Sequence, residues 1–208
     1  RDAGGLWEEH RVEDVASPMG WVINRKLVLK FYNGRRRELA RCEPNAGHLG
    51  LAALEKHFDV HVITQNIDNL HERAGSTDVV HLHGELTKAR STKDSDLIYD
   101  IGYKDINEGD KCELGSQLRP HIVWFGEAVP MIEEAVKITS QADIFVVIGT
   151  SLNVYPAAGL IEYVPDSASL WLIDPKDVYV PGDRKVAVIK EPASKGVEVL
   201  TAKLMALK

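Results

Sequence analysis

The sequence contains little cysteine and no long hydrophobic run. Cys42 and Cys112 are its two cysteines among 208 residues, and no C-x-x-C pair occurs. We therefore expect neither a disulfide framework nor a thiolate zinc site. No apolar segment reaches the roughly 18 residues that a membrane-spanning helix needs. No secretory signal opens the chain, so the expected location is cytoplasmic.

Basic residues are not in excess either. The formal net charge is −6, which argues against a general nucleic-acid role because phosphate contacts need a basic face. Arg35, Arg36 and Arg37 form the one basic cluster, and we expect Arg36 and Arg37 to lie on a solvated helix face. A hydrophobic fraction of 44% and a charged fraction of 27% are typical of an ordinary globular protein.

Short apolar segments rich in β-branched residues alternate with helical patterns, which favours an α/β fold with a parallel sheet. The predicted strands are 60–64, 79–83, 144–148, 169–173 and 185–189. The predicted helices are 46–58 behind an Asn45 cap, 131–140, and a segment from Pro156 to about residue 163. Val197, Leu200 and Leu204 have helical spacing, so we expect a final helix at the edge of the sheet.

Two segments interrupt this alternation. Residues 16–42 have a helical stripe and are predicted to form a helical insertion. Residues 87–119 are long, polar and without a clear helix, which is unusual inside a compact domain. We interpret the two segments as a small module beside the main sheet.

Polar residues follow several predicted strands, where open α/β sheets bind ligands. Gln65, Asn66 and Asp68 could hold a ribose and a carboxamide, although a turn with Asx-type hydrogen bonds is the alternative, and we favour that reading for Asn69. The small residues Gly149-Thr150-Ser151 could let a backbone approach a phosphate, with Asp174 on the ribose. A plain strand-to-helix turn is equally compatible with that pattern.

His81 and His83 are two residues apart, which places them on one face of a predicted strand. One of them could be a general base, because an imidazole titrates near neutrality. A metal pair with His71 and a buried, hydrogen-bonded histidine are the alternatives, and we favour the latter for His81. Gly84 leaves room for a close approach.

Two further patterns indicate peptide recognition. Tyr32 and Arg35 are three residues apart on one helix face, and a phenol with a guanidinium can bind a carboxylate. The run Val123-Trp-Phe-Gly-Glu127 is an extended apolar segment that could pair with an extended peptide, or it could be a buried strand.

Together these segments resemble a known family. The chain is similar to the sirtuins, NAD-dependent protein-lysine deacylases, over its whole length. The likeness is greatest to bacterial members of the class that includes the mitochondrial desuccinylase, in which a Tyr-x-x-Arg pair matches Tyr32 and Arg35. The matching segments occur in family order: Thr64-Gln-Asn-Ile-Asp68, His83-Gly84, Val123-Trp-Phe-Gly-Glu127, Gly149-Thr-Ser151 and Val154-Tyr-Pro156.

The resemblance implies a Rossmann-like parallel sheet with helices on both faces, plus a small module formed by two insertions. The implied large NAD-binding domain comprises 1–15, 43–86 and 120–208, and the implied small module comprises 16–42 and 87–119. NAD and an acyl-lysine peptide would bind between them. The implied reaction frees lysine and releases nicotinamide and O-acyl-ADP-ribose, with succinyl and malonyl groups preferred to acetyl groups.

The resemblance also assigns roles by position. His83 would be the catalytic base, removing a proton from a ribose hydroxyl once nicotinamide has left. The residues implied to bind NAD are Arg1, Gln65, Asn66, Asp68, Gly149, Thr150, Ser151, Asp174 and Ala193. The residues implied to bind the acylated peptide are Ala16, Tyr32, Arg35, Val123, Phe125, Gly126 and Glu127.

The sequence departs from the family in three places. The glycine-rich opening segment that cradles the pyrophosphate is missing before Arg1, and we expect that the printed sequence is truncated there. Asp174 stands where the family usually has Asn. Of the family's zinc cysteines only Cys112 is matched, and Ser91 replaces another, so we expect residues 87–119 to be metal-free and held by packing.

The expected partners are acylated-lysine proteins or peptides, and we expect a monomer that binds neither nucleic acid nor a membrane. Mono-ADP-ribosyl transfer is a second hypothesis, because it uses the same NAD. A non-catalytic module that binds NAD metabolites or acylated peptides is a third.

Overall fold

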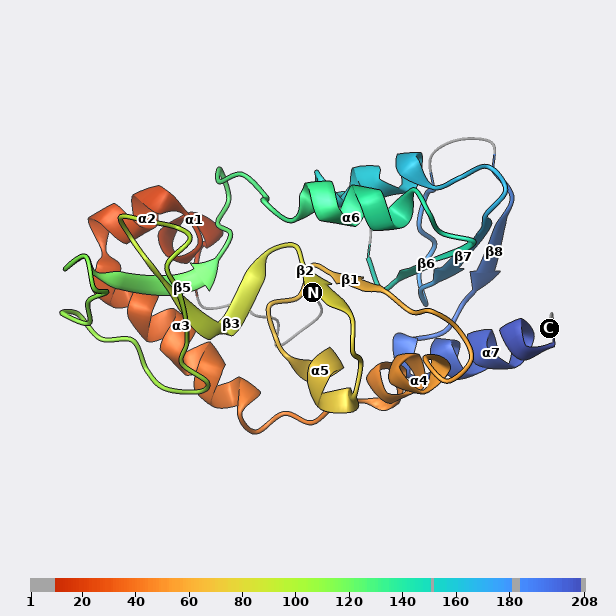
Figure 1. The fold of residues 1–208 in the computed structure, drawn as a ribbon, viewed down its shortest axis with the longest axis horizontal. Helices are drawn as coiled ribbons and strands as arrows, with labels where there is room; N and C mark the ends of the chain where they lie inside the picture. The colour runs from red at the N-terminus through yellow and green to blue at the C-terminus, as the bar shows by residue number, and fades with distance from the viewer. Residues whose placement is uncertain (1–9, 151, 181–183, 207–208) are drawn as a thin grey trace. The chain divides into compact units, whose positions relative to one another are not determined.

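The computed structural model describes residues 10–150, 152–180 and 184–206, and the chain divides into two compact units. Unit 1 contains the chain up to Cys42, together with Asn66–Asn69 and His83–Val129. Unit 2 contains Glu43–Gln65, Leu70–Leu82 and the chain from Pro130 onward. The chain therefore crosses from one unit to the other several times (Figure 1).

The helical part of unit 1 forms the insertion that the sequence predicted. The side chains of Ser17 and Asn24 cap the second and third helices, each accepting a hydrogen bond from a first-turn backbone amide. The third helix buries Val28, Phe31 and Tyr32 on one side. The helices are α1 (Val12–Val15), α2 (Pro18–Ile23) and α3 (Arg25–Leu39).

Arg36 is fully buried, so the prediction of a solvated side chain was wrong for this residue. Its Nε donates to the Leu86 carbonyl at 2.6 Å and its Nη1 donates to Asn33 Oδ1 at 2.7 Å. These bonds compensate part of the cost of burying the guanidinium. Burial lowers the pKa of Arg36 to about 10, so it remains protonated near neutral pH. Arg37 is exposed, as predicted, and pairs with Asp105 at 2.6 Å.

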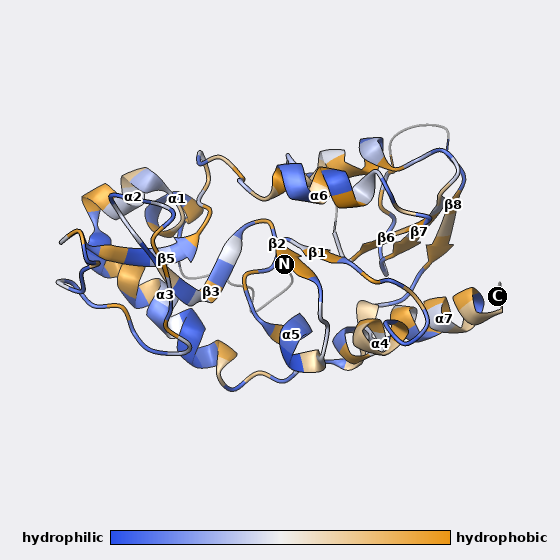
Figure 2. Cartoon of the chain, viewed as in Figure 1, coloured by the Kyte–Doolittle hydropathy of each residue, from blue (hydrophilic) through white to orange (hydrophobic). Residues whose placement is uncertain are grey.

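Unit 1 also contains an antiparallel sheet in the order β4-β3-β5. Its strands are β3 (Gly84–Ser91), β4 (Ile98–Asp100) and β5 (Leu118–Ile122). The sequence analysis found no clear helix over 87–119 and predicted no strand there, because the segment is rich in polar residues, as Figure 2 shows for β3 and β5. Pairing of β3 with β5 brings 83–86 and 120–129 into unit 1, whereas the sequence analysis assigned them to the large domain.

Unit 2 contains a parallel sheet of three predicted strands, β6 (Ile144–Ile148), β7 (Ser169–Ile173) and β8 (Val186–Ile189). Figure 2 shows these strands as predominantly hydrophobic. Alternate residues point to opposite faces, so Val146 and Ile148 belong to one hydrophobic cluster and Val147 belongs to the other. The sheet is thus buried on both faces, as parallel sheets usually are.

Helices cover both of these faces, as predicted. On one face, α7 (Ala193–Met205) packs its Val197, Leu200 and Leu204 against Ile173 of the central strand, and α4 (Ala46–Leu54) adds Leu51. Because α7 packs against the edge strand β8 as well as against β7, the expectation that this last helix lies at the sheet edge is met in part. The other face receives Ile161 of η1. The remaining elements are α6 (Ile132–Thr139), which contacts η1, and η1 itself (Ala157–Tyr163), a 3₁₀-helix rather than the expected α-helix.

A second parallel pair in unit 2 carries the first polar motif. Strands β1 (Val62–Thr64) and β2 (Val79–His81) flank α5 (Leu70–Ala74) and pair in register from Val62↔Val79 to Thr64↔His81. Strand β2 ends at His81, so the prediction that His83 shares a strand face with it was wrong. The chain turns at this point, and β3 begins at Gly84 with φ +80°. No helix in the described ranges is long and apolar enough to cross a membrane.

We expect Gly196→Ala to destabilise unit 2 by roughly 1–3 kcal/mol through overpacking. A Cβ at this position in α7 would lie 2.2 Å from Ile173 Cγ2. Gly34→Ala in α3 is the matched control, since a Cβ there meets nothing within 4 Å and alanine favours a helix. Denaturant unfolding should show the first change lowering the free energy of unfolding and the second leaving it equal or higher. Equal stability of the two variants would contradict the packing described.

Candidate functional site

The predicted site residues fall on both units, except Arg1 and Ser151, which lie outside the described residues. Unit 2 contains Gln65, Gly149, Thr150, Asp174 and Ala193. Unit 1 contains Ala16, Tyr32, Arg35, Asn66, Asp68, His83, Val123, Phe125, Gly126 and Glu127. The boundary between the units falls within two of the motifs, between Gln65 and Asn66 and between Leu82 and His83.

Within unit 2, the structure brings the residues after β1 and β6 together. The Gln65 side chain donates from Nε2 to Thr150 Oγ1 at 3.4 Å, and Leu152 N donates to the same oxygen at 3.3 Å. Gly149 has φ +61°, a conformation that favours glycine. Small and amide-bearing residues thus meet at the carboxyl end of β6, where α/β sheets bind nucleotides.

The two other predicted residues of unit 2 follow β7 and β8. Asp174 comes directly after β7, and its Oδ1 accepts a hydrogen bond from Lys176 N at 2.8 Å. Ala193 is the first residue of α7, and its carbonyl lies 3.1 Å from where a Cβ on Gly47 would be. Asp174 is therefore at the carboxyl end of the same sheet as Gly149.

The rest of the first motif lies in unit 1. The Ile67 carbonyl, between Asn66 and Asp68, accepts a hydrogen bond from Leu86 N at 2.7 Å. Asn69 donates from Nδ2 to the Tyr103 hydroxyl at 3.2 Å, a long-range contact in place of the expected Asx-type turn. The motif is thus anchored to β3 by its backbone.

His83 is partly exposed, and its backbone is anchored on the chain that follows β5. Its carbonyl accepts a hydrogen bond from Val123 N at 2.9 Å. A Cβ on the adjacent Gly84 would lie only 2.1 Å from the His121 carbonyl oxygen. The space that glycine leaves is therefore occupied by the neighbouring strand β5. This close packing fixes the position of the backbone next to His83.

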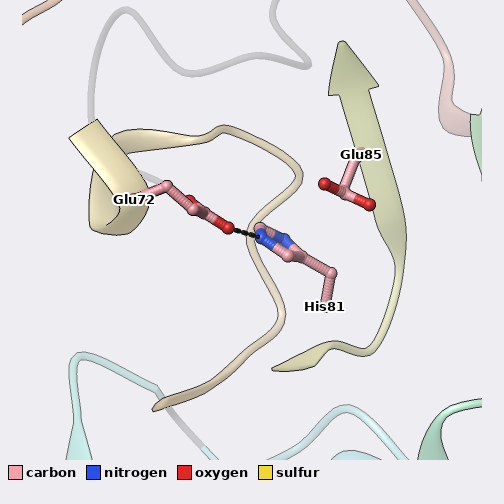
Figure 3. A group of neighbouring side chains, drawn as sticks. All are labelled: Glu72, His81 and Glu85. Atoms are coloured by element: carbon pink, nitrogen blue, oxygen red, sulfur yellow. Dashed lines mark hydrogen bonds and ion pairs between the residues drawn. The ribbon is translucent and has the colours of Figure 1, made fainter. Parts of the chain in front are cut away.

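His81 is a buried, hydrogen-bonded histidine, as favoured from the sequence. Its Nε2 lies 2.6 Å from Glu72 Oε1 of α5 (Figure 3). Burial raises the pKa of Glu72, but the hydrogen bond with His81, a backbone hydrogen bond and the nearby imidazoles of His81 and His71 together lower it overall. The pair connects α5 to β2, so the presence of a histidine at position 81 is explained by a structural contact within unit 2.

The run 123–127 is not a strand, because β5 ends at Ile122 and Gly126 has φ +91°. Arg119 donates from Nη1 and Nη2 to the two oxygens of Glu127, at 2.6 and 3.0 Å. Trp124 N donates to Glu127 Oε2 at 2.8 Å. The Arg119 guanidinium carbon also lies 3.3 Å from the centre of the Trp124 ring system. The carboxylate of Glu127 thus holds the turn closed.

The residues predicted to bind the acyl group meet this turn. Phe125 N donates to the Ala16 carbonyl at 3.0 Å, and Trp124 Nε1 donates to the Tyr32 hydroxyl at 3.0 Å. Arg35, one helical turn beyond Tyr32, is half-buried and pairs with Glu38 at 2.8 Å. Ala16, Tyr32 and residues 123–127 therefore form one cluster within unit 1. Phe125 and Gly126 are the exposed members of this cluster.

The sequence motifs missed Arg119 and Arg90, the two partners of Glu127. Arg90 Nη2 donates to Glu127 Oε2 at 3.2 Å. Neither arginine belongs to a motif; Arg90 lies 37 residues before Glu127 and Arg119 eight residues before it. The pair with Arg90 depends on β3 and β5 being neighbours, and the pair with Arg119 depends on the turn that follows β5.

The position where the family binds zinc does not fit that metal. Cys112 Sγ lies 3.1 Å from Ser116 Oγ and 3.4 Å from Ser91 Oγ, and the two hydroxyl oxygens are 2.8 Å apart. Tetrahedral zinc sites use thiolates, imidazoles and carboxylates, whereas this cluster offers one thiol and two hydroxyls. Hydrogen bonds with Ser116 and Ser91 lower the pKa of Cys112 to about 7.

The chain belongs to the Sir2 family, whose model matches residues 1–156. An NAD-dependent protein deacylase of Bacteroides thetaiotaomicron is 56% identical over 208 residues, which cover 96% of this chain and 88% of that protein. A protein of the same name from Helicobacter pylori is 51% identical over 205 residues, covering 99% and 89%. The sirtuin resemblance is thereby confirmed.

Solved structures agree with this membership and confirm the α/β, Rossmann-like fold. A Sir2 homologue in complex with ADP-ribose superposes with a TM-score of 0.88 at 33% identity, covering 100% of this chain and 86% of that one. A Sir2 homologue–NAD complex gives 0.86 at 33% identity, covering 98% and 82%. A Sir2 protein bound to an acetylated peptide gives 0.80 at 26% identity, covering 93% and 84%.

We expect Glu127→Gln to lower the free energy of unfolding by roughly 2 kcal/mol near neutral pH, since it removes charge-assisted hydrogen bonds. Burial raises the pKa of Glu127, but hydrogen bonds from Arg119 and Trp124 N lower it overall. Because the pKa of Glu127 is lower in the folded protein than in the unfolded chain, its ionised carboxylate stabilises the folded state at pH values above the unfolded-state pKa. This stabilisation is lost as the pH falls through the folded-state pKa.

The difference between wild type and variant should therefore shrink between about pH 7 and about pH 3.5 in urea unfolding experiments. Glu133→Gln on the exposed side of α6 is the control, with an expected change under about 0.5 kcal/mol at either pH. A Glu127→Gln deficit that is as large in acid as at neutrality would contradict the ion-pair interpretation.

Proposed function

We propose that this protein is an NAD-dependent protein-lysine deacylase that removes succinyl and malonyl groups more readily than acetyl groups. Membership of the Sir2 family and the deacylase relatives support NAD-dependent deacylation. The observation that carries the acyl preference is the cluster around α3, where a buried phenol and a guanidinium lie one turn apart. Dicarboxylic acyl groups end in a carboxylate, which such a pair can bind.

The residues at the carboxyl end of β6 fit NAD. Gly149 leaves its backbone open, because a Cβ there would meet nothing within 4 Å. Thr150 and Gln65 supply a hydroxyl and an amide for ribose or carboxamide groups. Asp174 offers a carboxylate oxygen to the adenosine ribose. Bound there, NAD would supply an electrophilic ribose carbon, with nicotinamide as the leaving group, and ribose hydroxyls to which the acyl group could be transferred.

His83 is the proposed general base. Its backbone is anchored by the Val123 amide and by the close approach of Gly84 to β5, while its side chain remains partly exposed. An imidazole in its neutral form can accept a proton from a ribose hydroxyl. Anchoring the backbone on both sides limits the positions that the imidazole ring can occupy. Correct positioning of a catalytic group contributes much of the rate acceleration of an enzyme.

We expect His83→Ala to reduce product formation by at least about 100-fold, as loss of a general base does. Mass spectrometry of succinyl-lysine peptides with and without NAD measures the product. His61→Ala, which removes an imidazole outside the proposed site, should keep full activity. Calorimetry should show that His83→Ala still binds the peptide. Unchanged turnover in His83→Ala would remove the general-base assignment.

We expect Arg35→Met to lower kcat/KM for succinyl-lysine peptides by roughly 10- to 100-fold, the usual effect of losing a charge-assisted hydrogen bond. Turnover of acetyl-lysine peptides should stay within about twofold, because an acetyl group carries no charge to read. Arg37→Met is the matched control, since Arg37 is exposed and pairs with Asp105. Equal losses on both peptides would show that Arg35 is not an acyl-selective residue.

ADP-ribosyl transfer would give a different result in the same assay. Labelled ADP-ribose would then appear on protein, with no free lysine formed. A non-catalytic module would bind the acylated peptide and form neither product.

A further inference from the structure

The hydrogen bond between Trp124 and Tyr32 has a fixed direction. Trp124 Nε1 lies 3.0 Å from the Tyr32 hydroxyl oxygen, and both side chains are buried, each 2% exposed. An indole N–H can only donate, so the Tyr32 oxygen must be the acceptor. The hydroxyl hydrogen is consequently directed elsewhere. The structure gives it no acceptor among the described residues.

Trp124 is itself held from several sides. Arg119 lies over its ring at 3.3 Å, and Trp21 contacts it with ring centres 5.7 Å apart. Its backbone N–H is bound by Glu127, which Arg119 also clamps. A side chain fixed by its backbone, by a cation and by a second ring can define the orientation of a weaker partner.

Tyr32 stays neutral in this environment. Burial raises the pKa of Tyr32 well above its usual value, and the hydrogen bond from Trp124 only partly opposes this. The phenol therefore keeps its hydrogen at any ordinary working pH. A neutral donor whose hydrogen has no partner among the residues that the structure describes can bind an anionic acceptor.

We propose that Trp124 is a positioning residue for acyl selection, which presents the hydroxyl hydrogen of Tyr32 to the terminal carboxylate of a dicarboxylic acyl-lysine. The inference rests on the proposed preference for succinyl and malonyl groups. Trp124 does not touch the reacting atoms in this scheme, and it acts through Tyr32 alone. An acetyl group has no terminal carboxylate, so its removal does not depend on this orientation.

Trp124→Phe tests the proposal, because it keeps a ring beneath Arg119 and removes the N–H. We expect KM for a succinyl-lysine peptide to rise roughly tenfold with little change in kcat, and acetyl-lysine turnover to stay within about twofold. Trp171→Phe is the matched control, since the buried Trp171 Nε1 has no hydrogen-bond partner in the described part of the chain. It should leave the ratio of the two activities unchanged.

The double variant Tyr32→Phe/Trp124→Phe separates positioning from a second, independent contact. If Trp124 acts only through the Tyr32 hydroxyl, the double variant should discriminate no worse than Tyr32→Phe alone. Additive losses would overturn the proposal. Equal losses on acetyl and succinyl peptides in Trp124→Phe would overturn it as well, because a general structural defect has that signature.

The same measurements distinguish this inference from the function on which it rests. A wild-type protein without preference for succinyl over acetyl peptides would end the proposed acyl selection. A wild type whose preference is lost in Tyr32→Phe but kept in Trp124→Phe would end only the positioning role.

Should Trp124→Phe fail to fold, indole N–H resonances of the ¹⁵N-labelled protein decide the question. Tyr32→Phe removes the acceptor, so one indole signal should shift. A succinyl-lysine peptide should shift that same signal, whereas an acetyl-lysine peptide should not. No shift with the succinyl peptide, or equal shifts with both, would overturn the proposal.

Discussion

The ion pair between Arg119 and Glu127 is the interaction on which the cluster of Ala16, Tyr32 and residues 123–127 in unit 1 depends. The turn after β5 contains no regular hydrogen-bond ladder, so its backbone needs another constraint. One carboxylate supplies it by accepting from Arg119, Arg90 and the Trp124 amide together. Removing Glu127 would leave the largely buried guanidinium groups of Arg119 and Arg90 without their carboxylate partner, which is costly. This ion pair fixes the position of Trp124, and Trp124 in turn positions the hydroxyl of Tyr32.

The two units are stabilised in different ways. Unit 2 has a hydrophobic parallel sheet that is covered on both faces, and its packing is close enough that glycines such as Gly196 are required. Unit 1 depends more on buried polar side chains, such as Arg36 on the Leu86 carbonyl and the hydroxyl–thiol cluster at Cys112. A hydrogen-bonded cluster occupies the place where the family binds zinc. Polar networks of this kind specify one arrangement because each donor needs its own acceptor.

The main sheet could be predicted from the sequence because its signals are local. Strands 144–148 and 169–173 are short apolar runs, and Asn45 caps α4 through its own side chain. The strands of unit 1 escaped prediction because they are hydrophilic and obtain their partners from distant segments. The burial of Arg36 escaped for the same reason, since its acceptor is the Leu86 carbonyl, fifty residues further along the chain.

The sequence by itself determined the family, the parallel α/β sheet and the list of candidate residues, because motifs such as Thr64-Gln-Asn-Ile-Asp68 and His83-Gly84 are contiguous. Only the tertiary structure decided which other groups those residues contact. It showed that His81 is hydrogen-bonded to Glu72 and that Glu127 forms an ion pair with Arg119. It also showed that the Tyr32 hydroxyl oxygen accepts a hydrogen bond from Trp124. The physical reason is that a hydrogen bond's partner and direction depend on distance and orientation, which spacing along the chain does not encode.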